Sequence, residues 1–389
     1  MIKNKFYCIL IHYDEIAIKL GNRRWFEKKL IQNIKNKIIS IKYRNIHNFC
    51  GRIFINNINK NDYQKLFDAL KNVMGISSIH MMVNTDTSIE SIKEESIKSI
   101  KAYPLAFKTF KVFTKRQNKS FSKTSQELNT IIGEVIRVEF KKDVRLKNPD
   151  IELRIEIIDN IALIGVEKIQ GYGGLPVGTG EKALSLISSG IDSPVASFKM
   201  LKRGVQLSYI HFHSSPATGD ESIHNVKKII CELSKFQSST QLFLVPFLDI
   251  QKAIMKISPN KYWIILFRRA MIKVASDIAN KNRFKALVTG DNVGQVASQT
   301  LSNINVISEK AKLPILRPLI GYNKKDIINL ATNIGTYDIS ILPYEDCCGF
   351  FVPRHPETKA NLKIIQDVEK EIRLDFNKLN IDLINTLNK

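Results

Sequence analysis

Hydrophobic positions in the first part of the chain follow the spacing of a small α/β unit. Residues 5–20 begin with an apolar run, which predicts a strand ending in a polar segment. Residues 23–42 place apolar side chains three to four positions apart, which predicts an amphipathic helix, and residues 50–58 predict another strand. The pattern therefore predicts a first small domain over residues 1–60.

A second α+β unit is predicted over residues 61–168. Apolar side chains at helical spacing, with breaks at Gly75 and Pro104, predict helices at 66–73, 89–102 and 125–138. Alternating residues predict strands at 109–114, 151–157 and 161–166. The last two strands flank Asp159-Asn160, a pair that is typical of a β-hairpin turn.

A glycine-rich linker at residues 169–180 precedes a third region, predicted over 181–389. There, short apolar runs alternate with helical patterns, which is typical of a doubly wound parallel sheet. The predicted strands are 183–188, 207–212, 241–246, 286–289 and 315–319. Sheets of this kind bind ligands at the carboxyl ends of their strands.

The sharpest local signal is Ser188-Ser189-Gly190-Ile191-Asp192-Ser193-Pro194, which joins an apolar strand to a helix. Ser193 is predicted as the N-cap and Pro194 as the first helical residue. A turn of small residues at a helix N-terminus exposes backbone N–H groups to phosphate. No lysine-bearing P-loop and no GxGxxG fingerprint is present. The segment predicts a phosphate site; an ordinary strand–turn–helix connection is the alternative.

The net charge of the chain indicates which kind of partner it binds. The chain of 389 residues has a net charge of +22, which favours a polyanion, although abundant Lys, Asn and Ile also fit a general composition bias. Basic residues alternate with phenylalanines between positions 107 and 123, a pattern suited to RNA. The predicted RNA-binding residues are Lys111, Lys115, Arg116 and Lys119. Phe110 and Phe113 are expected in the core.

The five cysteines are sparse and unevenly spaced, which argues against a disulfide framework or a structural zinc site. Cys8, Cys50 and Cys231 are expected to be buried and structural. Cys347-Cys348 lies in a polar segment between two prolines, which predicts an exposed loop. The chain has no apolar run of about 18 residues and no signal-like N-terminus, so we expect no membrane contact and a cytoplasmic location.

The loop at 188–193 resembles the SGGxDS pyrophosphate loop of the N-type ATP pyrophosphatases, with Ser189 where that family usually has glycine. The added side chain predicts a narrower phosphate cradle or a different backbone angle. Further segments resemble tRNA 4-thiouridine synthetases: HFHSSP at 211–216, FRR at 267–269, TGDNVGQVASQT at 289–300, ILRPLI at 315–320 and PYEDCCGFFVP at 343–353. MGISSIH at 74–80 and KVFTKRQNKSF at 111–121 are similar to the ferredoxin-like and THUMP part of that family.

The resemblance implies an α/β multidomain fold: ferredoxin-like and THUMP units, then a PP-loop domain with a doubly wound parallel sheet. Some members of that family carry a further rhodanese domain at the C-terminus, and we expect none in this chain. It also implies ATP contacts at Leu186, Ile187, Ser188, Ser189, Gly190, Asp192, Ser193, His211, Phe212, Arg268, Gly290 and Gln299. Taken alone, Arg268 and Arg269 would predict a solvated helix face. No protein-bound metal centre is expected.

The same resemblance implies the catalytic roles. Asp192 would help hold the Mg²⁺ that accompanies ATP, and Lys324 would offset charge at the α-phosphate. Cys348 best matches the sulfur-carrying cysteine, with Cys347 in reserve. Adjacent α-carbons are about 3.8 Å apart, whereas disulfides need roughly 4.4–6.8 Å, so a disulfide between these two would be strained. Direct attack by a Cys348 persulfide and transient help from Cys347 both remain open.

The implied activity is ATP-dependent formation of 4-thiouridine at position eight of tRNA, by adenylation of the uridine and transfer of persulfide sulfur. The implied partners are tRNA, a cysteine desulfurase as donor and a second copy of the chain. Three alternatives remain open: another PP-loop tRNA-modifying ligase, a non-catalytic tRNA-binding protein with a decayed ATP site, and a sulfur-carrier role in thiamine thiazole synthesis.

Overall fold

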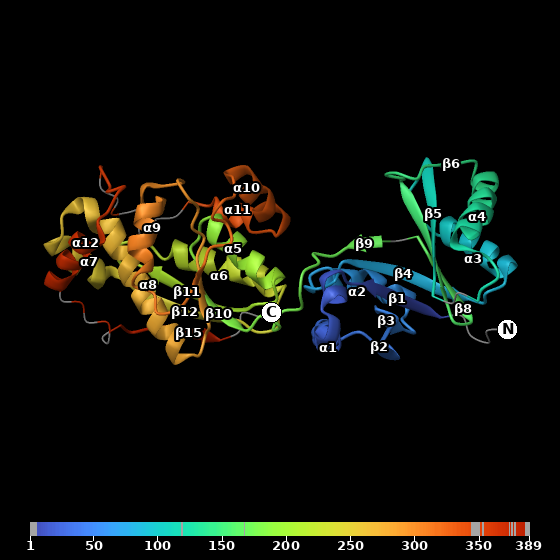
Figure 1. The fold of residues 1–389 in the computed structure, drawn as a ribbon, viewed down its shortest axis with the longest axis horizontal. Helices are drawn as coiled ribbons and strands as arrows, with labels where there is room; N and C mark the ends of the chain where they lie inside the picture. Colours follow the sequence, from blue (N-terminus) through green and yellow to red (C-terminus); the bar gives the residue numbers. More distant parts are fainter. Residues whose placement is uncertain are drawn as a thin grey trace. The chain divides into compact units, whose positions relative to one another are not determined.

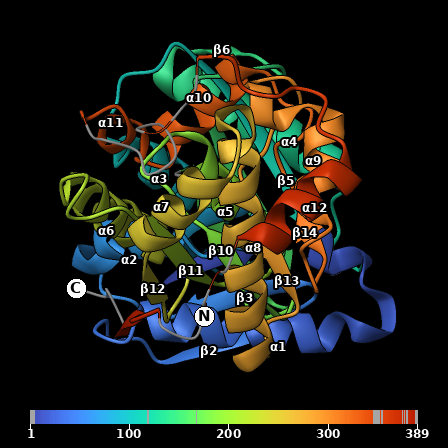
Figure 2. The same cartoon turned by 90° about the vertical axis from the view of Figure 1, so that its left-hand side faces the viewer.

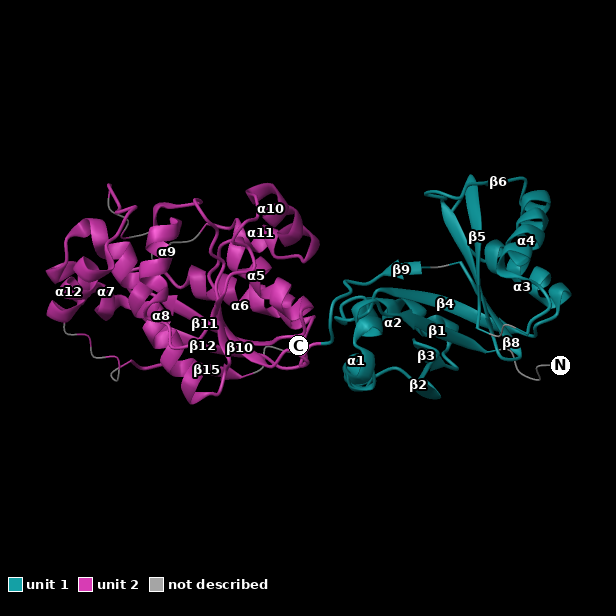
Figure 3. Cartoon of the chain, in the orientation of Figure 1, with its two compact units in different colours: residues 1–176 teal, residues 177–389 magenta. Residues whose placement is uncertain are grey.

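The computed structural model describes residues 6–117, 120–166, 168–343, 351, 354–372, 374, 376 and 379–385. It divides into two compact units, residues 1–176 and residues 177–389 (Figure 3). Each unit is described by itself. Within the described residues, no helix is long and apolar enough to cross a membrane.

Unit 1 is built on one mixed sheet with helices packed against it (Figure 1). In spatial order the strands are β2 (Asn45–Phe49), β3 (Arg52–Asn56), β1 (Tyr7–His12), β4 (Ser78–Thr85), β8 (Ile161–Gly165), β7 (Ile151–Ile158), β5 (Thr109–Arg116) and β6 (Asp143–Val144), while β9 (Lys168–Gln170) also pairs with β4. The helices are η1 (Glu15–Ile18), η2 (Leu20–Asn22), α1 (Arg23–Lys37), η3 (Lys60–Asp62), α2 (Tyr63–Leu70), α3 (Ile89–Lys101) and α4 (Ser125–Phe140).

Helices form two of the hydrophobic cores that lie against this sheet. In the first, α1 and α2 pack on β1, β3 and β4, and Leu66 of α2 is fully buried there. In the second, α3 and α4 pack on β5, β7 and β8. The predicted boundary at residue 60 therefore falls before a helix that belongs to the first core. The predicted helix at 23–42 ends at Lys37, and the turn at Asp159 joins β7 and β8 as the hairpin signal predicted.

Unit 2 contains a sheet of parallel strands with one antiparallel edge strand. The order is β14 (Ile315–Leu316), β13 (Ala286–Val288), β10 (Lys182–Leu186), β11 (Gln206–His213), β12 (Gln241–Pro246) and antiparallel β15 (Asp382–Asn385). The helices are α5 (Asp192–Lys202), α6 (Glu221–Ser234), α7 (Leu248–Ile257), η4 (Asn260–Tyr262), α8 (Trp263–Lys281), η5 (Ala297–Gln299), α9 (Leu301–Ser308), α10 (Lys324–Asn333), α11 (Tyr337–Ser340) and α12 (Leu362–Glu371).

Helices cover both faces of this sheet, which confirms the doubly wound architecture. Helices α5 and α6 contact β11 on one face, while α7 and α8 share the largest core with β10, β11 and β12 (Figure 2). From β10 the chain proceeds to β11 and β12 on one side and later to β13 and β14 on the other. The strand order thus reverses beside β10, and ligands bind at such a switch point.

Several predictions about single residues are wrong. Arg269 of α8 is fully buried, where it donates to Glu369 and Glu309, both at 2.8 Å; it does not lie on a solvated face. Cys8 is buried as expected, but Cys50 and Cys231 are exposed. Cys50 lies in the turn between β2 and β3, and Cys231 lies on an outward-facing position of α6.

Candidate active site

A cavity of about 280 Å³ opens at the carboxyl ends of β10, β11 and β13, at the switch point of the sheet. All of the residues predicted to contact ATP line it except Ser189 and Gly190: Leu186, Ile187, Ser188, Asp192, Ser193, His211, Phe212, Arg268, Gly290 and Gln299. The sequence did not single out several other lining residues: Ile210, Ile264, Met271, Thr289, Asp291 and Ser298. The structure therefore brings the predicted residues together, while their roles remain predictions.

The phosphate loop is held closed by Ser193. Its hydroxyl accepts from the Ser188 amide at 2.9 Å and is oriented to donate to the Ser188 carbonyl at 3.2 Å. The helix α5 begins at Asp192 after Ile191, so the predictions that Ser193 is the N-cap and Pro194 the first helical residue are wrong. The reason is that the Ser193 hydroxyl bonds backward to the loop and not forward to the helix.

Ser189 fits the loop without narrowing the cavity. Its side chain is only 1% exposed and does not line the cavity. Its backbone is not among the residues with positive φ, so this position does not demand a glycine. Among the described residues, the Ser189 hydroxyl has no hydrogen-bond partner. Serine in place of the usual glycine therefore adds a buried hydroxyl to the loop without adding an atom to the lining of the cavity.

Gly290, at the end of β13, lies against the backbone of the loop. A Cβ atom at this position would be 2.8 Å from the Ser193 nitrogen and 3.0 Å from the Asp192 carbonyl carbon. Real side chains do not tolerate such contacts with backbone atoms. Gly290 was predicted to allow a close approach to a ligand; the close approach that the structure contains is to the loop itself.

Asp192 and Lys324 are 132 residues apart in sequence but form an ion pair at the cavity mouth. The Lys324 ammonium lies 2.8 Å from Asp192 Oδ1, and Gln295 Nε2 donates to Asp192 Oδ2 at 2.9 Å. Lys324 is the first residue of α10, which Asn323 caps by accepting from the Asp326 amide. Asp192 and Lys324, two of the predicted catalytic residues, are therefore in contact beside the phosphate loop.

Asp291 is a buried carboxylate that accepts hydrogen bonds from two arginines. Arg268 donates to its Oδ1, and Arg317 donates to its Oδ2 at 3.0 Å. Thr289 also donates to Oδ2, at 2.8 Å. Burial acts to raise the pKa of Asp291, but the two guanidinium charges and the Thr289 hydroxyl outweigh it and lower that pKa below its ordinary value. Arg268 also donates to the Ser298 carbonyl at 3.3 Å.

The inner wall of the cavity is apolar and carries a neutral histidine. His211 Nδ1 lies 2.9 Å from the Ile187 carbonyl, and burial lowers the pKa of His211 to about 4. The ring is therefore neutral at pH 7, with its proton on Nδ1 to make this bond. Leu186, Phe212 and Met271 contribute the apolar surface beside it. Such a wall suits the flat face of a purine.

The two cysteines predicted to act in sulfur transfer, Cys347 and Cys348, lie outside the described residues, and so does Lys119. The neighbouring α11 is close to the phosphate loop, because the Ser340 hydroxyl lies 3.4 Å from the Gly190 carbonyl. The sulfur-carrying role of Cys348 therefore stays a prediction from sequence.

The predicted RNA-binding residues that the structure describes lie on β5 of unit 1. Lys115 is exposed, and Arg116 Nη1 donates to the Phe121 carbonyl at 3.1 Å. The Lys111 ammonium lies 5.3 Å from the centre of the Phe113 ring. Phe110 is buried as expected. Phe113 is only partly buried, and its ring is covered by the side chains of Lys111 and Arg154. Lys111, Phe113 and Lys115 alternate along β5 and therefore lie on one face of the strand, whereas Arg116 follows on the other.

A buried acid lies behind this surface. Glu156 of β7 is 0% exposed, and its carboxylate lies 2.7 Å from Arg52 Nε, 3.1 Å from Arg154 Nη1 and 3.3 Å from His12 Nε2. The Arg154 guanidinium in turn covers the Phe113 ring at 4.7 Å. One carboxylate therefore fixes the position of several basic groups from different strands. No local sequence pattern predicts this cluster, because its members are far apart along the chain.

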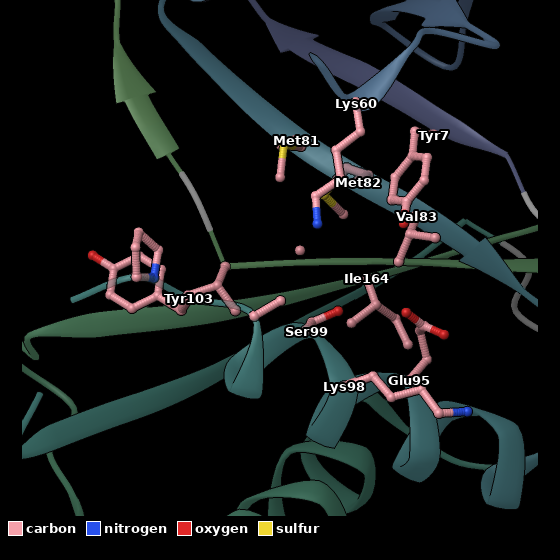
Figure 4. A pocket seen from close by; sticks show the side chains of 14 residues that line it. Tyr7, Lys60, Met81, Met82, Val83, Glu95, Lys98, Ser99, Tyr103 and Ile164 are labelled. Carbon is pink, nitrogen blue, oxygen red and sulfur yellow. The ribbon is translucent and has the colours of Figure 1, made fainter. Parts of the chain in front are cut away.

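A second cavity, of about 260 Å³, lies in unit 1 between β4 and α3 (Figure 4). Lys60 and Met81 lie on one side of it, and Ser99 and Glu95 of α3 lie on the other. Its walls are mostly apolar. None of the predicted site residues that the structure describes lines this cavity, so it does not belong to the candidate active site.

Comparison with known proteins bears on both units. The family described as Thiamine biosynthesis protein (ThiI) matches residues 178–374, the ThiI ferredoxin-like domain matches residues 8–80, and the THUMP domain matches residues 86–167. A probable tRNA sulfurtransferase of Thermoanaerobacter sp. (strain X514) is 41% identical over 371 residues, covering 95% of this chain and 96% of the relative. The corresponding protein of Halothermothrix orenii is 42% identical over 389 residues, covering 97% and 96%.

Among solved structures, a 4-thiouridine synthetase–RNA complex with bound ATP is 34% identical, with a TM-score of 0.85. The match covers 97% of this chain and all of the other. Together with the cavity at the switch point and the loop at 188–193, these matches show that the chain belongs to the ThiI family of tRNA sulfurtransferases.

Proposed function

We propose that this protein is an ATP-dependent tRNA uridine 4-sulfurtransferase that acts on position eight of tRNA. The observation that carries the proposal is the cavity at the switch point, where a phosphate loop, two ion pairs and an apolar wall meet. Family membership and the similarity to an ATP-bound 4-thiouridine synthetase support it. A cytoplasmic location belongs to the same proposal, because tRNA and ATP are both available there.

The residues of the cavity suggest how ATP is held. The apolar wall with Leu186 and Phe212 would take the adenine, and the loop at 188–193 would take the β- and γ-phosphates through its backbone N–H groups. Lys324 and Arg268 bring positive charge to the phosphates. The uridine O4 then attacks the α-phosphorus, and pyrophosphate leaves. This step converts the O4 atom into part of a good leaving group, AMP.

Sulfur transfer completes the reaction. The terminal sulfur of a Cys348 persulfide attacks C4 of the adenylated uridine, and AMP leaves. Two thiols from outside the chain then reduce the S–S bond that joins Cys348 to the base. The first forms a mixed disulfide with Cys348 and releases 4-thiouridine, and the second frees the Cys348 thiol and leaves as a disulfide with the first. A cysteine desulfurase would supply the persulfide. The target base has to leave its stack to reach the cavity, and a homodimer is part of the proposal.

Mg²⁺ would fit beside Asp192. Of the two carboxylates among the described lining residues, Asp192 is the one that no arginine contacts, and Mg²⁺ prefers carboxylate oxygen together with phosphate oxygens. When bound, the ion neutralises charge on the phosphates. Lys324 and Gln295 hold the two oxygens of Asp192 in this structure, so ion binding there requires at least one of them to turn away.

The experiment that tests the proposal measures pyrophosphate release and 4-thiouridine with tRNA, ATP and a persulfide donor, for the wild type and for Cys347→Ser and Cys348→Ser. We expect Cys348→Ser to keep pyrophosphate release and lose 4-thiouridine. Full thiolation by both variants would remove the sulfur-carrier assignment. Absence of pyrophosphate release from the wild type would favour a tRNA-binding protein with a decayed ATP site.

A second role has a specific observation in its favour: the matching family is described as a thiamine biosynthesis protein. We propose that the same persulfide can serve thiazole synthesis. A deletion strain tests this role, because thiazole auxotrophy is the expected result and normal growth without thiazole would contradict it.

A further inference from the structure

Two arginines share one buried carboxylate at the cavity, but only one of them lines it. Arg268 lines the cavity and donates to Asp291 Oδ1. Arg317 donates to Asp291 Oδ2 at 3.0 Å and to the Ser308 hydroxyl at 2.7 Å, and it is not among the described lining residues. The Asp291 side chain is only 6% exposed, so its charge is neutralised by these neighbours and not by water.

Because Asp291 contacts both Arg268 and Arg317, its negative charge neutralises Arg268 only in part. This determines how much positive charge Arg268 presents to a ligand. Two guanidinium groups and one carboxylate leave a net charge of one at this cluster. If Arg317 were neutral, Asp291 would neutralise Arg268 alone and the cluster would have no net charge. A buried ion pair of this kind presents much less field to a phosphate than an unmatched cation does.

We propose that Arg317 is a positioning residue for the nucleotide: by taking one oxygen of Asp291, it leaves Arg268 incompletely neutralised toward the phosphates. The inference rests on the proposed function, because it assumes that the cavity takes ATP. Arg317 acts through Asp291 and Arg268 and does not itself touch the nucleotide. The alternative is a purely structural role, in which Arg317 only ties the end of β14 to α9 through Ser308.

Net charge and anchoring predict different results for a pair of variants. Arg317→Gln lowers the cluster charge to zero and also removes the anchor. Asp291→Asn combined with Arg317→Gln restores the net charge of one but leaves the anchor broken. Charge sharing therefore predicts that the second substitution rescues nucleotide binding, whereas anchoring alone predicts that it does not.

The test is isothermal titration of the full-length chain with ATP, at low and at moderate salt. We expect Arg317→Gln to weaken ATP binding about tenfold, the order of effect for one charge near a phosphate in a partly screened site. The double variant is expected to bind within about twofold of the wild type. Arg317→Lys keeps the positive charge but not both contacts of the guanidinium, so it is expected to bind ATP more tightly than Arg317→Gln does. Arg137→Gln, which removes an exposed arginine paired with Glu134 in unit 1, is the matched control and should change nothing.

Two results would overturn the inference alone. One is a double variant that binds ATP as weakly as Arg317→Gln while its far-ultraviolet spectrum and melting curve match the wild type. The other is an Arg317→Gln variant that binds like the wild type. A wild-type chain that binds no ATP would instead overturn the proposed function, and this inference with it.

Discussion

The cavity of unit 2 and the β5 surface of unit 1 both gather basic side chains, but they hold them in different ways. In the cavity, Arg268 pairs with the buried Asp291, and at its edge the half-exposed Lys324 pairs with Asp192. On β5, Lys115 is exposed and Arg116 bonds only a backbone carbonyl among the contacts described. The cavity therefore suits a compact polyphosphate and depends on geometry, whereas the surface suits an extended polyanion and depends on the number of charges.

The largest expected effect is a loss of pyrophosphate release with no change in tRNA affinity, which would separate the function of the cavity from that of the β5 surface. Asp192→Ala removes the carboxylate that Lys324 and Gln295 both contact, so it should lower pyrophosphate release by at least about 100-fold. Its affinity for tRNA should not change. A filter-binding assay and a pyrophosphate assay on the same preparation measure both quantities. Asp367→Ala, at an exposed pair on α12, is the control, and an Asp192→Ala variant with half of the wild-type rate would refute the assignment.

Gly290→Ala tests whether geometry governs the cavity. The new Cβ would be 2.8 Å from the Ser193 nitrogen, so the loop has to shift. We expect ATP binding to fall by about tenfold or more and the free energy of unfolding to fall by about 1–3 kcal/mol. Gly321→Ala is the matched control, since no atom lies within 4 Å of its added Cβ. Equal ATP affinity for both variants would show that the loop is not tightly held by β13.

The number of positive charges on β5 should determine its affinity for tRNA. Lys115→Ala and Arg116→Ala should each weaken tRNA binding severalfold and reduce the slope of log affinity against log salt by about 0.7–0.9. ATP binding should stay at the wild-type level. Titrations at several salt concentrations measure the slope, with Lys71→Ala, at an exposed ion pair with Asp68 at the end of α2, as the control. An unchanged slope would remove these two residues from the RNA interface.

A smaller effect concerns pH and unit 2. The pKa of His211 is lowered to about 4 in the folded chain, whereas the unfolded chain takes up this proton near pH 6.5. The unfolded state therefore binds more protons, and the free energy of unfolding should fall by about 2 kcal/mol between pH 7 and pH 5. Trp263 fluorescence in a Trp25→Phe background reports unit 2. A His211→Phe variant should lose this part of the slope; an equal slope in both would contradict the burial of a neutral imidazole.

The smallest expected effect is at Ser189. Because its hydroxyl is buried, has no partner among the described residues and does not line the cavity, Ser189→Ala should change ATP affinity by less than about twofold and stabilise the chain by at most about 1 kcal/mol. Thermal melts and ATP titration measure both. A large gain in ATP affinity would mean that the serine does narrow the phosphate cradle.

The sequence allowed prediction of features that depend on short segments. The loop at 188–193 and the strand ends around His211 and Gly290 follow from apolar runs and small residues. The strand β4 was missed, because burial on both faces removes the alternation that marks a strand. Ser193 was misassigned, because a local capping rule competes with its bond to Ser188.

Pairings between distant segments were not predictable from residue patterns. Asp291, between Arg268 and Arg317, is fixed by the order of β10, β13 and β14, which no local pattern encodes. The same holds for Glu156, which gathers cations from several strands of unit 1. Lys324 was found only through the resemblance, and its place beside Asp192 comes from the fold.

The most direct test of the central claim counts AMP and 4-thiouridine in one reaction of the full-length chain with unmodified tRNA, ATP and a persulfide donor. One AMP should appear for each 4-thiouridine at position eight, and omission of ATP should abolish the product. Formation of 4-thiouridine without ATP, or with no matching AMP, would contradict activation of the uridine in this cavity.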